Sequence, residues 1–463
     1  KFLNTFYFQY GHRSIADLAH LAFAIEKLSI LAATILVDEP RWDGQERSRY
    51  QDFQKSGYYV PDFAVDAIAL QLYRETIDFL FAEYRYFSEA MIVCLQERTP
   101  KPGEMKQDAY ERTLKARAFD LSRYLLPMAT NTSLGQIVSA RTLENQVSRL
   151  LSDPHAEVRR LGELLKKAAR EAAYNVNHAA AERMLHEVEQ RSSELAERVR
   201  NVALREVHVA PTLMKYAEPN LYEQESRREL SGAAAELLGG LAIDAAPLVD
   251  LLEDEPLEVE LATTLLYQHS HHSYRQIRGV VEDMTSSRRN EIIELGLRHR
   301  GRHDEVSRAY YSGQKFRFDI LMDIGAFRDM HRHRRCVQIL QDYTTLHGFD
   351  RPEDIDSANL ATRYAAAMQR ASNASAQLAA RPIAETAEQA QYVIPLAYRK
   401  RALFKMDFAE ALYISELRTG PAGHFSYRNV AYAMYEAVAK RYPELAKHFH
   451  VTDVREPVDI LKR

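Results

Sequence analysis

The sequence predicts a helix-rich α+β protein built from two similar halves. Stretches with apolar residues at helical spacing dominate the chain, strand-like alternation is rare, and Gly (17) and Pro (16) are few. Short elements also recur in the same order in the two halves. The 463 residues exceed the size at which one hydrophobic core stops growing, so two domains are expected.

Three stretches predict long helices. Residues 62–97 indicate one or two amphipathic helices, and residues 141–204 indicate a helical stretch that is broken near Asp153-Pro154. Residues 356–381 are Ala-rich and end before Pro382, which predicts a third helical stretch.

Two segments predict strands. Residues 21–25 and 316–320 alternate in character, and a helical run follows each of them. Residues 207–209 are a third strand candidate.

Composition disfavours several classes of protein. The net charge is −4 with a pI near 6.5, whereas a general nucleic-acid binder is usually basic, so nucleic acid is not expected as a partner. No run of about 18 apolar residues predicts a membrane helix, so no membrane partner is expected. The first residues lack the order of a signal peptide, and two cysteines suit a reducing compartment. We therefore expect a cytoplasmic protein.

An ordered internal repeat predicts a divergent tandem duplication. Leu126-Pro127-Met128 recurs as Ile394-Pro395-Leu396, at an offset of 394 − 126 = 268. Gln51-Asp52-Phe53 recurs as Gln341-Asp342-Tyr343, at an offset of 341 − 51 = 290. Because the elements follow the same order in both halves, we place a first domain at 1–204 and a second at 205–463.

The densest basic run is His331-Arg332-His333-Arg334-Arg335. It follows a strand-then-helix pattern that looks half buried, where arginines are costly without anionic partners. The planar fork of donors on Arg suits phosphate and flavin carbonyl oxygens. Anion binding therefore competes with the simpler interpretation, a solvated basic helix face.

Two further groups of residues suggest anion binding. Ser48 and Arg49 follow the Gly44 turn and would hold a phosphate, although helix N-caps look similar. Arg401 follows the Pro395 turn and Arg418 precedes Gly420-Pro421, and each would otherwise be a surface charge.

The histidine-rich segments do not predict a metal centre. His269, His271 and His272, with His299 and His303, fit no standard metal spacing, so we interpret them as solvated or hydrogen-bonded and expect no metal. No GxSxG or HExxH motif indicates a hydrolase.

Together these motifs resemble the flavin-dependent thymidylate synthases. In the first half, Gly11-His12-Arg13-Ser14 resembles the Gly-His-x-Ser/Thr element of the family, whose Ser/Thr contacts FAD. Residues 45–50 resemble the loop that holds the nucleotide phosphate. Arg141 and Asn145 fall near positions that contact FAD in that family. However, Val37-Asp38-Glu39 stands where Arg-His-Arg belongs. The post-Pro arginine is replaced by Ser133 and the last arginine by Leu150.

In the second half the losses are reversed. Arg332-His333-Arg334 matches the signature, and Arg401 lies six residues after Pro395, as in the family. Arg418 matches the arginine that binds the pyrimidine. The phosphate loop is shortened, and Asp329, Asp407 and Ala409 replace the Gln, Asn and Arg of the family.

The resemblance implies two tandem copies of the family fold, each a mixed sheet with long helices. It implies a FAD-dependent methyltransferase that methylates C5 of dUMP or a related pyrimidine nucleotide, with NADPH and methylenetetrahydrofolate as co-substrates. Because the two halves keep complementary motifs, a homodimer would form a pseudo-tetramer of domains with composite sites. The implied cofactor-binding residues are His12, Ser14, Arg141, Asn145, Arg332, His333 and Arg334. The implied substrate-binding residues are Ser48, Arg49, Arg401 and Arg418, with Arg418 also catalytic.

Two alternatives stay open. Asp329 places a negative charge beside the expected nucleotide, where it would repel phosphate or orient an arginine. The altered phosphate loop would select another uridine-like nucleotide, so the first alternative is flavin-dependent methyl or hydroxymethyl transfer to a different pyrimidine. The other alternative is a non-catalytic pseudoenzyme that keeps the fold as an assembly scaffold or a nucleotide sensor.

Overall fold

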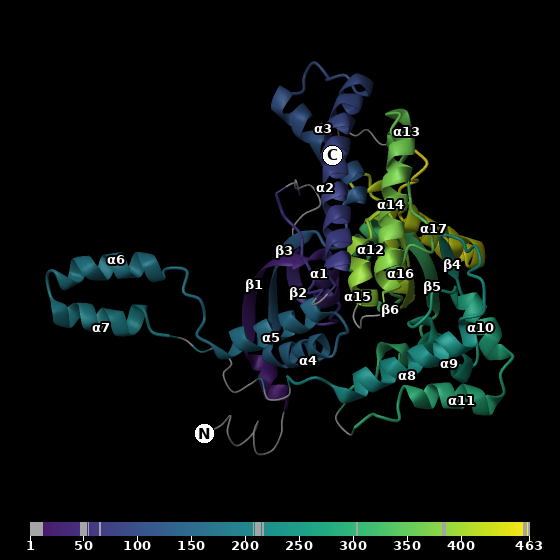
Figure 1. The fold of residues 1–463 in the computed structure, drawn as a ribbon, viewed down its shortest axis with the longest axis horizontal. Helices are drawn as coiled ribbons and strands as arrows, with labels where there is room; N and C mark the ends of the chain where they lie inside the picture. The colour runs from purple at the N-terminus through teal and green to yellow at the C-terminus, as the bar shows by residue number, and fades with distance from the viewer. Residues whose placement is uncertain are drawn as a thin grey trace. The chain divides into compact units, whose positions relative to one another are not determined.

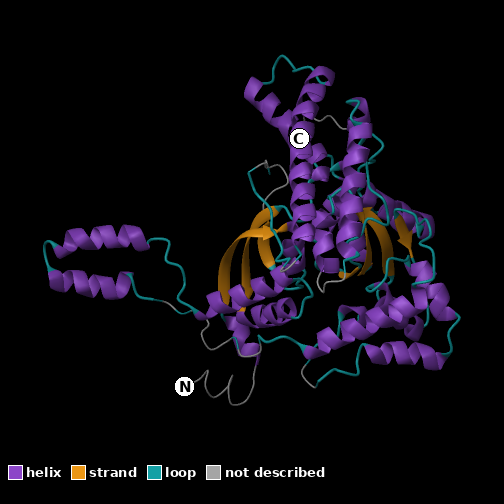
Figure 2. Ribbon diagram, viewed as in Figure 1, coloured by secondary structure: helices purple, strands orange, loops and turns teal. Residues whose placement is uncertain are grey.

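The computed structural model describes residues 13–46, 53, 55–63, 66–206, 208, 214, 217–301, 304–381, 386–456 and 461. Helices predominate over small sheets, so the predicted helix-rich α+β class is confirmed (Figures 1 and 2).

The chain forms two compact units in space. The first unit contains the described residues up to Ile25, together with Arg41–Gln45 and Gly135–Asn220. The second contains Glu26–Pro40, the described residues from Glu46 to Leu134, and those from Leu221 onward. These units are composed differently from the predicted domains 1–204 and 205–463, whose boundary stays a prediction.

The first half of the chain contains a three-stranded sheet with the strand order β1-β3-β2. Its strands are β1 (His20–Ser29), β2 (Asp43–Glu46) and β3 (Asn131–Ser139). The strand expected at 21–25 is therefore confirmed. The strand expected at 207–209 lies mostly outside the described residues, and His208 makes an isolated bridge to Ala172.

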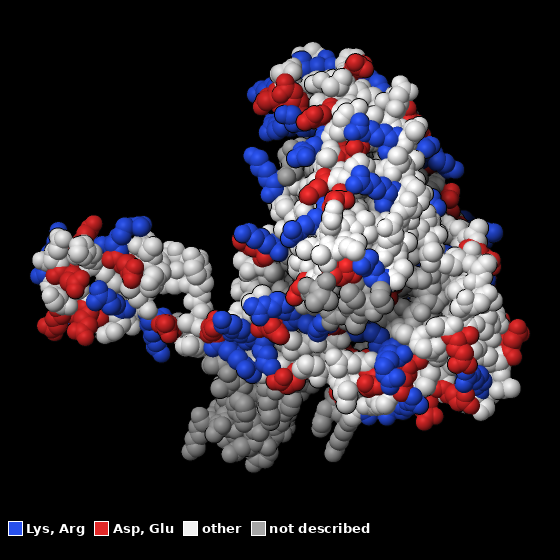
Figure 3. Space-filling model, in the orientation of Figure 1, with Lys and Arg blue, Asp and Glu red and all other residues white. Residues whose placement is uncertain are grey.

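Several helices belong to the first unit. The first unit contains η2 (Arg13–Leu18), α4 (Ala140–Leu151), α5 (Ala156–Arg170), α6 (His178–Glu189) and α7 (Ser193–Ala203). The expected break near Asp153-Pro154 separates α4 from α5, and the Ser139 hydroxyl caps α4 by accepting from Thr142 N. Helices α6 and α7 pack on each other, and both carry acidic and basic side chains (Figure 3).

The second unit is larger. Its helices before β5 are α1 (Ile30–Val37), α2 (Ala67–Arg98), α3 (Gln107–Ser122), η3 (Arg123–Leu125), α8 (Leu221–Leu238), α9 (Leu257–Tyr267), α10 (Tyr274–Glu282), α11 (Ser286–Leu295) and η4 (Arg308–Tyr310). Those after β5 are α12 (Ile324–Met330), α13 (Glu353–Ser357), α14 (Ala361–Ala379), α15 (Thr386–Ala390), η5 (Gln391–Val393), α16 (Phe408–Thr419), α17 (Phe425–Arg441) and α18 (Pro443–Ala446). The stretch expected at 356–381 is split, because Asn359 adopts a positive φ of 57° between α13 and α14.

The second sheet is antiparallel rather than mixed as expected. Its strands are β4 (Val249–Leu251), β5 (Phe316–Asp323), β6 (Val337–Leu340) and β7 (Arg399–Met406), in the order β4-β5-β7-β6. Strands β5 and β6 run in the same direction, but β7 lies between them and pairs antiparallel with both. Every neighbouring pair is therefore antiparallel. Strand β5 confirms the strand expected at 316–320.

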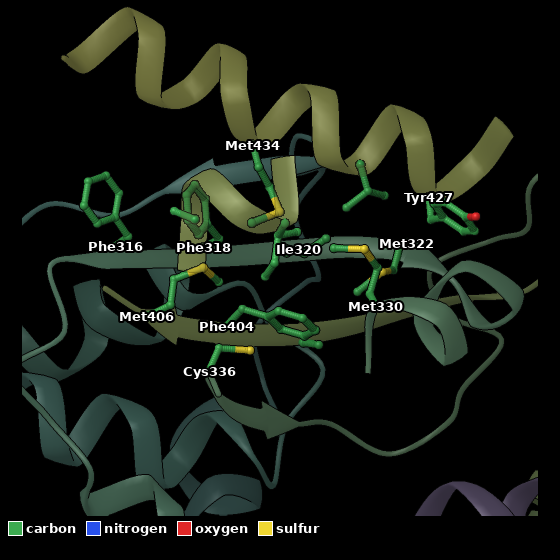
Figure 4. Close-up of a cluster of buried hydrophobic side chains, with 14 of the residues drawn as sticks. Phe316, Phe318, Ile320, Met322, Met330, Cys336, Phe404, Met406, Tyr427 and Met434 are labelled. Atoms are coloured by element: carbon green, nitrogen blue, oxygen red, sulfur yellow. The ribbon is translucent and has the colours of Figure 1, made fainter. Parts of the chain in front are cut away.

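The two faces of this sheet have different chemistry. Phe318 and Ile320 of β5 lie in one apolar cluster with Phe404 of β7 and Met434 of α17 (Figure 4). The opposite face packs on α9 and neighbouring helices, where Leu403 joins a second apolar cluster. Charged side chains of β5 and β7 are also buried on that face.

Candidate functional site

The Arg332-His333-Arg334 run lies in the tight turn between α12 and β6. The Asp323 carboxylate begins α12 by accepting from Ala326 N at 2.8 Å. The helix ends at Met330, and Arg334 N then donates to Arg332 O at 3.0 Å. The motif is thus held between a capped helix and a strand of the sheet.

Neighbouring side chains fix the main chain of this turn. His333 N donates to Met330 O at 3.1 Å. Its carbonyl oxygen accepts from Gln338 Nε2 at 2.9 Å and from Cys336 Sγ at 2.8 Å. Gln338 Oε1 also lies 2.7 Å from Nδ1 of the buried His331, so that nitrogen carries a proton. These contacts leave the turn little freedom.

Arg418 reaches the same turn from the last turn of α16. Its Nε donates to His333 Nε2 at 2.8 Å, while His333 Nδ1 lies 3.5 Å from Glu410 Oε1. Burial lowers the pKa of His333, so the imidazole is neutral at pH 7 and able to accept this bond. The Arg418 guanidinium lies 5.4 Å from the Tyr427 ring centroid.

The guanidinium of Arg418 keeps donors for a ligand. Among the residues that the structure describes, no hydrogen bond or ion pair engages its two terminal nitrogens. Arg332 is exposed and Arg334 is half-buried in the adjacent turn. Among the predicted site residues of the second half, the structure therefore brings Arg332, His333, Arg334 and Arg418 together.

Arg401 is not part of this cluster. It is 1% exposed and its Nη1 donates to Asp319 Oδ2 at 3.0 Å. The same carboxylate accepts from Tyr267 OH at 2.7 Å and from Tyr274 N at 2.8 Å. Both tyrosines lie in the apolar cluster on the face of the sheet opposite α16. Its role in substrate binding stays a prediction, and in this structure its visible partner is Asp319.

The first unit places two of the predicted flavin residues on one helix. Arg141 and Asn145 are four residues apart on α4, so they lie on the same face. Arg141 Nη1 donates to Asp17 Oδ2 at 3.1 Å, and both side chains are about one-third exposed. Ser14 lies in η2. The predicted residues His12, Ser48 and Arg49 lie outside the described residues.

Three of the histidines noted in the sequence have ordinary partners. His269 Nδ1 contacts Ser231 Oγ, His299 Nε2 contacts Glu229 Oε1, and His272 Nε2 contacts Leu241 O. Within the described part of the chain, no group of His, Cys, Asp and Glu side chains is arranged to hold a metal ion. His303 lies outside that part.

The sequence did not reveal the contacts of two residues near the site. Glu410 stands beside the substituted flavin element yet is buried against His333. Asp38, in the place of the missing first-half histidine, accepts from Arg308 through both its carboxylate and its carbonyl oxygen. The sequence revealed the loss of the motif at Asp38 but not the new partner.

Comparison with known proteins decides the family. The sequence pattern of the family described as thymidylate synthase complementing protein matches residues 1–173 and 247–444, which is most of the chain. The chain belongs to this family. It is the flavin-dependent thymidylate synthase family, so the resemblance found in the motifs is confirmed.

Relatives of this thymidylate synthase family member are proteins named UPF0159. One from Chlamydia pneumoniae is 27% identical over 96% of this chain and 79% of its own length. One from Chlamydia muridarum is 27% identical over 96% of this chain and 80% of its own length. One from Thermoplasma acidophilum is 26% identical over 74% of this chain and 61% of its own length.

The residues of this family member fit a flavin in part. Arg332 and Arg418 present guanidinium groups that suit phosphate or ring carbonyl oxygens. In contrast, Asp407 is paired with Arg335 at 3.0 Å, where the family has a flavin-contacting Asn. The second half thus offers donors beside the turn but not the complete flavin element. In the described residues, no helix is both long and apolar enough to cross a membrane.

Proposed function

We propose that this chain is a FAD- and folate-dependent methyltransferase of the thymidylate synthase type, acting on C5 of dUMP or a related pyrimidine nucleotide. The observation that carries the proposal is the Arg418 guanidinium, which is fixed beside Arg332-His333-Arg334 and whose terminal nitrogens no described residue engages. Family membership supports the reaction class. The proposal includes the cytoplasm as the location, as expected for nucleotide metabolism.

In the proposed reaction the protein orients its ligands and supplies fixed positive charge. FAD, when bound, supplies hydride-transfer chemistry, with NADPH and methylenetetrahydrofolate as co-substrates. Arg418 binds the pyrimidine and stabilises negative charge that develops on its ring. Arg332 and Arg334 contact flavin and substrate. An arginine suits this role because it stays charged when water is excluded.

We further propose that the two halves descend from one duplicated unit. The strand order β1-β3-β2 of the first half corresponds to β5-β7-β6 of the second. In the first half, Asp38 replaces the motif histidine and is engaged by Arg308, so a second copy of the Arg418 site is not expected there. The remaining flavin and phosphate residues, Ser14, Ser48, Arg49, Arg141 and Asn145, come from the first half. A homodimer would bring four copies of the fold together.

The test is ligand binding by the purified chain. Yellow absorption from bound FAD, and thermal stabilisation by dUMP, support the proposal. Arg418→Ala should abolish dUMP stabilisation and leave FAD bound. A colourless protein that is not stabilised by FAD, dUMP, UMP or folates would overturn it.

A second candidate is a scaffold or nucleotide sensor without catalysis. The Arg401–Asp319 pair favours it, because an arginine expected to bind substrate is committed to a buried carboxylate. This candidate predicts nucleotide binding without turnover when FAD, NADPH and methylenetetrahydrofolate are supplied.

A further inference from the structure

We propose that His333 is a positioning residue which, together with Glu410, orients the guanidinium of Arg418 toward a pyrimidine nucleotide. The direction toward a nucleotide rests on the proposed function, whereas the orientation of Arg418 does not. Glu410 is not among the residues that the motifs of the sequence indicated.

The polar groups of His333 all face other groups of the protein. Its main-chain nitrogen and oxygen are engaged by Met330, Gln338 and Cys336, as described above. Its ring nitrogens face Glu410 and Arg418. A ring whose two nitrogens face protein side chains acts on a ligand through its neighbours. The expected flavin contact of His333 is therefore better explained as an effect on Arg418.

The hydrogen-bond chemistry fixes the tautomer of His333. An arginine Nε–H only donates, so His333 Nε2 must present its lone pair to Arg418. The ring proton then lies on Nδ1, on the side of the Glu410 carboxylate. The Glu410 side chain is 6% exposed, and its Oε1 lies 3.5 Å from the imidazole Nδ1. Glu410 thus selects the tautomer that can hold Arg418.

Helix α16 is suited to this arrangement because it carries both partners of the imidazole. Asp407 Oδ1 caps the helix by accepting from Glu410 N at 2.9 Å, which fixes the first turn. Arg418 follows two turns later on the same helix. The ring of His333 thus lies between Glu410 and Arg418 of this helix. Tyr413, between them in the sequence, packs edge-on against the His333 ring, with 5.8 Å between the two ring centroids.

The consequence for Arg418 is a guanidinium with a defined plane. With Nε held, the two terminal nitrogens form a fork that suits bidentate contact with carbonyl or phosphate oxygens. Without the acceptor, the long side chain regains rotamer freedom that ligand binding must then remove. Loss of the imidazole should therefore weaken nucleotide binding while Arg418 itself is still present.

Protonation of His333 should release Arg418. The charged groups that face the ring are Glu410 and Arg418 from α16 and Asp329 from α12. Burial, the largest effect, holds the pKa of His333 below its usual value despite the two carboxylates. Once protonated, Nε2 becomes a donor and repels Arg418. Nucleotide affinity should then fall with decreasing pH through a step that depends on His333.

The first experiment needs no ligand. In a ¹H–¹⁵N spectrum of arginine Nε–H groups, Arg418 should give a slowly exchanging signal that disappears in Arg418→Lys. His333→Leu should remove the signal, and His333→Gln should retain it because a Gln oxygen can accept. His272→Leu, which removes another buried hydrogen-bonded imidazole on the other face of the sheet, is the control and should leave the signal unchanged. A protected Arg418 signal in His333→Leu overturns the proposal.

The second experiment titrates the FAD-loaded full-length protein with dUMP. At pH 7.5, His333→Leu should raise the Kd for dUMP about tenfold to thirtyfold, the range for loss of one charge-assisted contact, with FAD affinity within about twofold of wild type. His333→Gln and His272→Leu should stay within about threefold of wild type. Equal dUMP affinity in wild type and His333→Leu overturns the proposal.

If His333→Leu does not fold, the test is a comparison of pH profiles between wild type and His333→Gln. Wild-type affinity for dUMP should fall more steeply below pH 6 than the affinity of His333→Gln. Titration of the dUMP phosphate lowers both affinities equally, so it does not affect the difference between the two profiles. Identical profiles overturn the proposal. If wild type does not bind dUMP but the Arg418 signal behaves as expected, the proposed function fails and the positioning of Arg418 by His333 stands.

Discussion

Pro127 and Pro395 lie opposite each other in an antiparallel bridge. Met128 N donates to Ile394 O and Leu396 N donates to Leu126 O, each at 3.0 Å. The two prolines are 268 residues apart, the offset at which the Leu-Pro-Met element recurs in the sequence. The two matching elements therefore pair with each other, which is the arrangement expected if a pseudo-twofold axis relates the two halves.

Hydrogen bonds around the bridge repeat in the same way. Ile30 N donates to Thr130 O and Ile324 N donates to Tyr398 O, each at 2.9 Å. Ile30 begins α1 directly after β1, and Ile324 begins α12 directly after β5. The same local geometry thus joins corresponding elements in both halves. It supports the proposed duplication more directly than any single sequence match.

The Arg401–Asp319 pair should behave as a structural ion pair. Arg401→Leu leaves a buried carboxylate without its cation, so we expect the free energy of unfolding to fall by about 3–5 kcal/mol. Urea unfolding followed by circular dichroism measures this. The double variant Arg401→Leu with Asp319→Leu should recover most of the loss. Normal stability combined with lost dUMP binding would instead assign Arg401 to the substrate.

The contact between Asp38 and Arg308 should stabilise the fold modestly. Both side chains are about one-quarter exposed, so water screens the pair. Asp38→Asn keeps a side-chain acceptor and removes the charge, and we expect a loss of about 1 kcal/mol in the free energy of unfolding. Asp78→Asn, which changes an exposed carboxylate bonded to Tyr58, is a matched control with a smaller expected loss. Equal losses in Asp38→Asn and Asp78→Asn would show that the contact of Asp38 with Arg308 stabilises the fold no more than an exposed contact does.

The sequence predicted those parts of the fold that depend on local pattern. Strand β5 was recognisable because a helical run follows it, and the break before α5 because Pro154 cannot continue a helix. Strand β7 was not predicted, and Arg401 had a surface charge as its alternative interpretation, whereas Lys400, Arg401 and Lys405 of this strand are all buried. These side chains are buried against partners on distant elements, such as Asp319 and Glu260, which spacing along the chain does not reveal.

The same distinction applies to the candidate site. Arg332, His333 and Arg334 were found because they form a contiguous motif, and Arg418 because it has a defined place before Gly420. The contact between Arg418 and His333 joins residues 85 positions apart, and Glu410 has no motif of its own. Sequence spacing therefore indicated the candidate groups, but tertiary contacts decide how one side chain orients another.

Arg334 and Arg418 should separate cofactor binding from substrate binding. Arg334→Ala is expected to weaken FAD binding about 30-fold, corresponding to about 2 kcal/mol for one charge-assisted contact. Arg418→Ala should abolish dUMP binding and leave FAD affinity within about twofold of wild type. Fluorescence quenching of FAD and dUMP titration measure the two effects. Arg335→Ala, an exposed neighbour paired with Asp407, should change neither. Unchanged FAD and dUMP binding in both test variants would contradict the assignment.

His347 should make the protein less stable in mild acid. Burial, with Arg401 and His271 nearby, lowers its pKa from 6.5 to about 3. The unfolded chain therefore takes up a proton at pH 5 that the folded chain does not, so stability falls as the pH drops below 6.5. The loss from this group at pH 5 is about 2 kcal/mol. His347→Gln should remove it, so that the fall in unfolding free energy between pH 7.5 and pH 5 shrinks by that amount.

Asp323 affects the pH dependence of stability in the opposite sense. Burial raises its pKa to about 6, so the folded form holds the extra proton. Because Asp323 is present in both wild type and His347→Gln, its effect cancels in the comparison. Equal falls in wild type and His347→Gln would show that His347 accepts a proton in the folded state, and that its ring is more accessible than the structure indicates.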